Sequence, residues 1–164
     1  MTAELTKVSL KRGFPLEMAS KLWRWLNSPR GPNFDDFGPQ TQAQFMMELA
    51  VRVRRERAWS IMVDGEIVGY LGFVPQNPMA GQFHGLVIAP EYRRQGIGRD
   101  AFREAMETLR EEGYTSFTSM PFADNRAIHE LLFSLGFLWV GELPNATKRD
   151  GQLCSLSIFH KEVR

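Results

Sequence analysis

The sequence has little of what disulfide-bonded, secreted and membrane proteins depend on. One cysteine, Cys154, stands among the 164 residues, so no internal disulfide is expected and the chain suits a reducing compartment. No apolar run approaches the ~20 residues that a membrane span requires. The first residues contain no apolar stretch of the kind found in a secretory signal. We therefore expect a soluble, cytoplasmic protein without a membrane partner.

An excess of one charge is also missing. Lysine and arginine number 20 and aspartate and glutamate 19, which gives a net charge of +1. A dedicated nucleic-acid binder usually carries a large basic surplus, so nucleic acid is not an expected partner. The histidines have no spacing with one another or with Cys154 that suggests metal ligands, and no metal is expected.

The hydrophobic residues, 43% of the chain, are typical of a single globular domain, which we expect to span residues 1–164. Asp64-Gly65 between two β-rich runs predicts a hairpin with a type I′ turn. The prolines and glycines of 27–40 predict a long loop. Strands are expected near 5–10, 59–63, 66–74, 81–89, 115–120, 137–143 and 153–159, and helices near 15–26, 41–53, 97–112 and 125–135.

This order predicts a mixed sheet. Three consecutive strands joined by short turns form an antiparallel meander, and the long helix after them allows a crossover to a parallel neighbour. The expected class is α/β or α+β, with helices on both faces of the sheet. The arginines at 52, 54, 55 and 57 are expected to form the basic end of the second helix.

The segment 86–99, LVIAPEYRRQGIGR, contains the chemistry-bearing pattern of the chain. A buried strand runs into a turn, and the turn opens a helix. Gly96 and Gly98 leave the backbone bare, so that N–H groups at the helix start can converge on an anion. Arginines at 93, 94 and 99 add positive charge and forked donors suited to phosphate. We interpret the turn as a pyrophosphate-binding site.

Three motifs compete for this turn. GIGRDA matches the G-x-G-x-x-A form of the dinucleotide fingerprint, but the next strand ends at Ser119-Met120-Pro121 without the acidic residue that this fingerprint needs. A Walker A motif is excluded because no Gly-Lys-Ser/Thr follows. The third motif is R-x-x-G-x-G, given by Arg93, Gly96 and Gly98.

With the third motif, nearly the whole chain resembles the GNAT superfamily of acetyl-CoA-dependent N-acyltransferases. VIAPEYRRQGIGRDAFREAMETLREEG is similar to that family's acetyl-CoA motif and the helix that follows it. ADNRAIHELLFSLGF (123–137) is similar to a second signature, with an asparagine near a helix start and Gly-Phe at its end. The closing hairpin pattern fits as well.

The resemblance implies a mixed, mostly antiparallel sheet of six to seven strands, flanked by about four helices and splayed between strands 4 and 5. Acetyl-CoA would enter that opening, with its pantetheine arm paired to the fourth strand and its pyrophosphate on the amides of 94–99. Asn125 would touch the pantetheine side. The residues so assigned to acetyl-CoA are Leu86, Val87, Ile88, Arg93, Arg94, Gln95, Gly96, Ile97, Gly98, Arg99 and Asn125.

The same resemblance suggests direct transfer of an acetyl group to a primary amine in a ternary complex. His84 stands two residues before Leu86, at an offset where the serotonin N-acetyltransferase branch carries a histidine. The ordinary pKa of histidine, near 6.5, suits a general base at neutral pH, so His84 is the candidate base. Glu66 is a reserve candidate, and the alternative for His84 is a histidine that only lines the cleft.

One position departs from the family pattern. Many members carry a tyrosine four residues before the glycine of Gly-Phe, where its hydroxyl protonates the departing sulfur, and this chain has Leu132 there. A thiol of pKa about 8.5 that leaves as thiolate at pH 7 forgoes only about 2 kcal/mol, so activity is not excluded. Water or Ser134 could assist. A non-catalytic acyl-CoA-binding or protein-interaction domain of the same fold remains the alternative.

The loop 27–40, which joins the first two helices, is the candidate binding segment for the acceptor amine. Phe34 and Phe37 bracket Asp35 and Asp36, a combination of apolar surface and negative charge that suits a cationic amine. The alternative is an ordinary solvated loop whose aspartates form turns. A monomer or a homodimer is expected.

Overall fold

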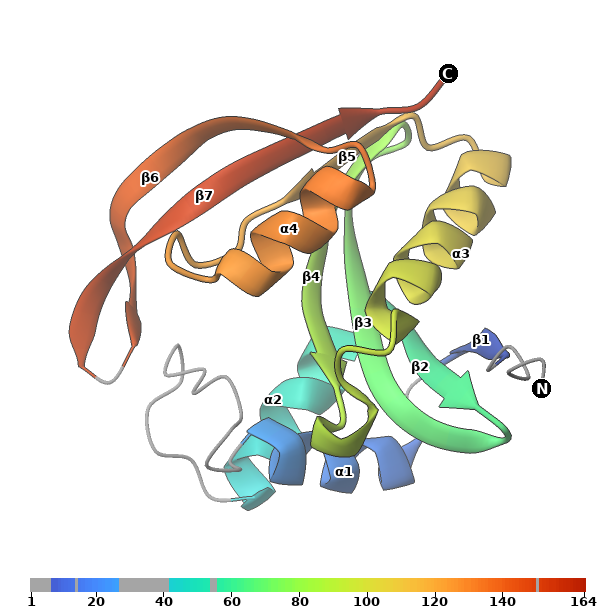
Figure 1. The fold of residues 1–164 in the computed structure, drawn as a ribbon. Helices are drawn as coiled ribbons and strands as arrows, with labels where there is room; N and C mark the ends of the chain where they lie inside the picture. The colour runs from blue at the N-terminus through green and yellow to red at the C-terminus, as the bar shows by residue number, and fades with distance from the viewer. Residues whose placement is uncertain (1–6, 14, 27–41, 54–55, 150) are drawn as a thin grey trace.

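The strands and helices follow one another in the order that the sequence predicts (Figure 1). The computed structural model describes residues 7–13, 15–26, 42–53, 56–149 and 151–164. The elements are β1 (Val8–Arg12), α1 (Leu16–Leu26), α2 (Gln42–Val53), β2 (Arg57–Val63), β3 (Glu66–Asn77), β4 (Ala80–Ile88), the short 3₁₀ helix η2 (Pro90–Tyr92), α3 (Ile97–Glu111), β5 (Ser116–Ser119), α4 (Arg126–Ser134), β6 (Leu138–Arg149) and β7 (Gln152–Glu162). No helix in these ranges has the length and hydrophobicity of a membrane span.

The strands form one seven-stranded sheet in the order β1-β2-β3-β4-β5-β7-β6. Neighbouring strands are antiparallel except β4 and β5, which are parallel and are connected through α3. The predicted mixed sheet with a single parallel crossover is therefore confirmed. The type I′ hairpin is confirmed too, because Asp64 and Gly65 have φ values of 50° and 84°.

Several predicted boundaries differ from the structure: β1 ends at Arg12 rather than at residue 10, and β3 ends at Asn77 rather than at 74. Helix α2 ends at Val53, and Arg57 is the first residue of β2 rather than part of a basic helix end. Its guanidinium lies over the ring of Tyr114 and pairs with Glu112, so this arginine belongs to the sheet and to the end of α3. The closing hairpin is longer than predicted, because β6 and β7 extend to Arg149 and from Gln152.

A hydrophobic core lies on each face of the sheet. The larger core packs α3 and α4 against one face, where the ring of Phe83 contacts those of Phe102 and Phe117. The smaller core packs α1 and α2 against the other face, where Leu22 and Leu49 meet Tyr70 of β3. The central strands are therefore covered on both sides, which leaves them as a rigid support for a site.

Strands β4 and β5 pair over only part of their length. Their ladder runs from Ala80↔Ser116 to Phe83↔Ser119, and then β5 ends. The following chain turns to β7, where Phe122 bridges Leu156 and the Ala123 N–H donates to the Ser155 carbonyl at 2.9 Å. Beyond Phe83, β4 continues without a β5 partner, and Figure 1 shows its lower half running away from β5 toward α1. The splay expected between strands 4 and 5 is therefore present.

A β-bulge lies at the start of this unpaired half. On β3, Tyr70 and Gly72 are two residues apart, but their partners on β4, Val87 and His84, are three apart. The extra residue is Gly85, whose φ of 67° is in the left-handed region that favours glycine. The bulge places His84 and Val87 on the α1/α2 face, while Leu86 packs toward the α3/α4 core.

Candidate active site

The unpaired half of β4 offers one side of a ladder to a ligand. It contains the three residues expected to pair with pantetheine, Leu86, Val87 and Ile88. Val87 is buried, and the other two are half-buried against the α3/α4 core. On their other side Val87 and Ile88 are already paired with Tyr70 and Gly69 of β3, while Leu86 lies in the bulge. Backbone groups that face the missing β5 partner can bind an extended, amide-rich chain.

The turn after β4 is held by its own side chains. The Arg93 Nε donates to the Ile88 carbonyl at 2.9 Å, and the Gln95 Nε2 donates to the Glu91 carbonyl at 3.0 Å. Arg94 has a φ of 63° and is exposed. The sequence predicts that Arg93 offers forked donors to phosphate, and in the structure its Nε closes the turn onto the end of β4.

The start of α3 is free of side-chain caps. Its N-cap, Gly96, has a φ of 81° and no side chain to bond the first N–H groups of the helix, which have no partners within the helix. Ile97 is buried and anchors the helix start, whereas Arg99 is exposed. A Cβ built on Gly98 would lie 3.3 Å from Leu86 Cδ2 and 3.7 Å from Leu131 Cδ2, so β4, α3 and α4 meet here. The free amides and the helix dipole suit a diphosphate.

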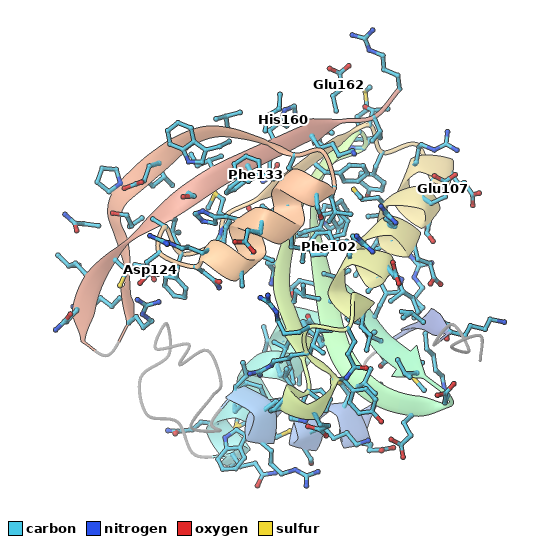
Figure 2. The ribbon with its side chains drawn as sticks, viewed as in Figure 1. Phe102, Glu107, Asp124, Phe133, His160 and Glu162 are labelled. Atoms are coloured by element: carbon cyan, nitrogen blue, oxygen red, sulfur yellow. The ribbon has the colours of Figure 1, made fainter. Side chains whose placement is uncertain are left out.

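Asn125 is the N-cap of α4. Its Oδ1 accepts a hydrogen bond from the Ile128 N–H at 3.4 Å. The preceding residue, Asp124, pairs with Arg149 at the end of β6, and Figure 2 shows its side chain between α4 and the β6–β7 hairpin. The hydrogen bond from Arg149 lowers the pKa of Asp124 below its ordinary value. The start of α4 is thus fixed from two directions.

His84 differs from the other two histidines in its contacts. The Nε2 of His129 lies 3.2 Å from the Phe122 carbonyl, and the Nε2 of His160 lies 3.0 Å from the Ser116 hydroxyl, so both serve the fold. His84 is the first residue of β4 beyond its last pair with β5. Its Nε2 lies 3.0 Å from Oε2 of Glu56, a carboxylate just before β2. A histidine and a carboxylate therefore meet where β4 and β5 separate.

Glu56 was not identified from the sequence, because it lies in the run RVRRERAW, whose arginines predict the basic end of a helix. The alternation of side chains between the two faces of a strand could have identified Glu56. Arg57 points to the α3 side, where it meets Tyr114, so the residue before it points to the α1/α2 side. That is the face that carries His84.

Other candidates are not brought to this place. Glu66, the reserve base, is exposed at the start of β3 and accepts a hydrogen bond from the Tyr92 hydroxyl at 3.1 Å. It is six residues from Gly72, the partner of His84, which is roughly 20 Å along a strand. The Ser134 hydroxyl donates to the Leu131 carbonyl at 2.7 Å. Leu132 is fully buried in the α3/α4 core.

Two further expectations concern acceptor residues and metals. Phe34, Asp35, Asp36 and Phe37 lie outside the described residues. Within the described ranges, no group of three or more His, Cys, Asp or Glu side chains is arranged to hold a metal ion.

Comparison with known proteins gives the family. Residues 19–137, more than two thirds of the chain, match the acetyltransferase (GNAT) family. N-acetyltransferase 8 of Rattus norvegicus is 29% identical over 89 residues, which cover 51% of this chain and 40% of that protein. The match therefore spans less than half the length of this curated relative.

Solved structures share the fold across nearly the whole chain. An N-acetyltransferase from Staphylococcus aureus Mu50 is similar with a TM-score of 0.77 at 15% identity, covering 97% of this chain and 100% of that one. The structure of yncA from Salmonella typhimurium, with its cofactor acetyl-CoA, is similar with a TM-score of 0.70 at 15% identity, covering 96% and 94%. At these identities the likeness is one of fold. Since the family match covers most of the sequence and the splayed sheet agrees with it, the chain belongs to the acetyltransferase (GNAT) family.

Proposed function

We propose that this protein is an N-acetyltransferase that transfers the acetyl group of acetyl-CoA directly to a primary amine in a ternary complex. One observation carries the proposal: an unpaired half-strand begins at His84 and ends in a turn that opens the uncapped helix α3. These two features suit acetyl-CoA. The half-strand offers its backbone N–H and C=O groups to the pantetheine amides, and the helix start offers its N–H groups to the pyrophosphate. The family and the solved structure with acetyl-CoA support the same reading.

The proposed chemistry is general-base catalysis by His84. A lysine-like amine is neutral in only about one molecule in two thousand at pH 7, so a proton must be removed from it. The amine nitrogen then attacks the thioester carbonyl carbon, the C–N bond forms, and the C–S bond breaks with its electron pair going to sulfur. His84 accepts the proton that the ammonium group loses before the attack, directly or through water, and the second proton, lost from the nitrogen as the amide forms, passes to solvent.

The leaving thiolate takes its proton from solvent in this proposal. Leu132 is buried in the core and carries no hydroxyl, and Ser134 donates to a backbone carbonyl on the outside of α4. Departure as a thiolate forgoes about 2 kcal/mol at pH 7, which is small beside the barrier reductions that enzymes achieve.

The alternative is an acyl-CoA-binding or interaction domain without catalysis, and the buried Leu132 is the observation that favours it. Release of free CoA thiol from acetyl-CoA, measured against a mixed panel of small amines, polyamines and peptides, separates the two. Thiol release that depends on an amine, with a matching mass increase of the acceptor, supports the transferase. Tight acetyl-CoA binding without amine-dependent thiol release supports the alternative.

A further inference from the structure

The nearly buried carboxylate of Glu56 is unexplained by the fold. Its side chain is only 11% exposed, and a carboxylate removed from water is costly unless a partner compensates it. Among the described residues, the basic side chain recorded in contact with it is His84, whose Nε2 is 3.0 Å from Oε2. Both of these atoms are inaccessible to solvent, while the His84 side chain as a whole is 22% exposed. The exposed part of the side chain is therefore not Nε2.

Gly72 makes this contact possible. Glu56 precedes β2 and His84 lies on β4, so β3 separates them. Strands β2 and β4 are therefore about 10 Å apart. On β3, Gly72 is paired with Ala58 of β2 on one side and with His84 on the other. A Cβ built on Gly72 would lie 2.8 Å from His84 Nε2 and 2.8 Å from the Tyr70 hydroxyl oxygen. The missing side chain leaves room for the imidazole to lie over β3 and reach the carboxylate.

Conformation does not explain this glycine. Gly72 is not among the glycines with positive φ, so any residue could adopt its backbone shape. The reason for a glycine here is therefore steric, because the His84 ring and the Tyr70 hydroxyl fill the place that a side chain would take.

We propose that Glu56 is a positioning residue for His84: its carboxylate accepts the Nε2–H, fixes the ring in that tautomer and leaves Nδ1 as the nitrogen that takes the proton of the amine. This rests on the base role proposed above. The oxygen lies at hydrogen-bonding distance but off the direction of the ring N–H, so the bond is not fully formed in the free protein. Bonds of this kind tighten when substrates bind. Once Nδ1 is protonated, the imidazolium faces the carboxylate, which compensates its charge.

The tautomer is tested first, because this measurement needs no activity. Long-range ¹H–¹⁵N spectra of protein labelled at histidine show which ring nitrogen carries the proton in the neutral side chain. The expected result is the Nε2–H tautomer at His84, replaced by a mixture in Glu56→Gln and Glu56→Ala. An Nδ1–H tautomer in the unchanged protein overturns the proposal.

The kinetic test compares these two variants with His84→Ala. Glu56→Gln keeps the shape and one neutral oxygen acceptor, so we expect kcat to fall by about 10-fold to 10²-fold, less than in Glu56→Ala and no more than in His84→Ala. The KM for acetyl-CoA should stay within about 2-fold. Glu107→Gln on the exposed side of α3 is the matched control and should keep the full rate.

The outcomes separate the two proposals. If His84→Ala is slow and Glu56→Gln is as fast as the unchanged protein, the positioning role is wrong and the base role stands. If His84→Ala keeps the full rate, the base role is wrong and Nδ1 takes no proton from the amine. If no amine is acetylated at all, the proposed function fails.

Discussion

His84 is the residue on which the proposed chemistry depends. His84→Ala should lower kcat/KM for the amine by about 10²-fold, because a general base contributes at least this much, and acetyl-CoA affinity should change little. The dependence of the rate on pH should also change, since the group that takes the proton of the amine is gone. Steady-state rates across the pH range, with calorimetry for acetyl-CoA, check both. An unchanged profile would show that His84 only lines the cleft.

The missing side chain at Gly72 gives a second prediction. Gly72→Ala adds a methyl group 2.8 Å from His84 Nε2 and from the Tyr70 hydroxyl oxygen, so the imidazole must move. A misplacement of about 1 Å can cost 10²-fold in rate, and we expect a loss of that order in kcat. Gly141→Ala is the matched control, because nothing lies within 4 Å of a Cβ at that position. Equal rates in the two variants would contradict the prediction.

The turn between β4 and α3 should determine the affinity for acetyl-CoA. Gly98→Glu places a carboxylate at the uncapped helix start and a Cβ 3.3 Å from Leu86, so we expect binding to be abolished. Affinity of the unchanged protein should also weaken as salt rises, because phosphate contacts are partly electrostatic. Calorimetry measures both effects, and circular dichroism verifies the fold. Gly141→Glu should bind normally, and normal binding by a folded Gly98→Glu protein would remove the assignment.

The contact between α4 and β6 gives a pH prediction. The hydrogen bond from Arg149 lowers the folded-state pKa of Asp124 below the ordinary value of 3.8, so its stabilising effect is present above that value and is lost as the pH falls through the folded-state pKa. Asp124→Asn should therefore have a lower Tm than the unchanged protein at neutral pH, and the difference should shrink in strong acid. The Asp124 side chain is largely exposed and that of Arg149 is half-buried, so the effect is small. Glu130→Gln, on the exposed side of α4, should show no such convergence.

The whole molecule is expected to unfold as one domain, because both hydrophobic cores share the same sheet. Leu109→Ala in the α3/α4 core and Leu22→Ala in the α1/α2 core should each lower the free energy of unfolding by about 2–5 kcal/mol. Each should shift one and the same transition rather than produce a second one. Urea denaturation followed by near- and far-UV circular dichroism checks this. Two separate transitions would divide the chain into two domains.

Local patterns made most of the fold predictable. The turn residues Asp64 and Gly65, the helix start at Gly96 and Asn125, and the apolar spacing of α3 depend on neighbours in the sequence, and these elements agree with the structure. Contacts across the sheet were not predictable in this way. Glu56 meets His84 only because β2, β3 and β4 are adjacent and Gly72 is bare between them.

The bulge at Gly85 makes β4 tolerant of a change in chain length at one place. Without this extra residue, Leu86 would stand opposite Leu71, between the existing pairs of Tyr70 with Val87 and Gly72 with His84. Every side chain would then keep its present face of the sheet. Loss of one residue elsewhere in the strand would turn all the following side chains to the opposite face. A deletion beside the candidate base is thus the shortening that packing can absorb, and variation in the length of this strand among related chains should concentrate there.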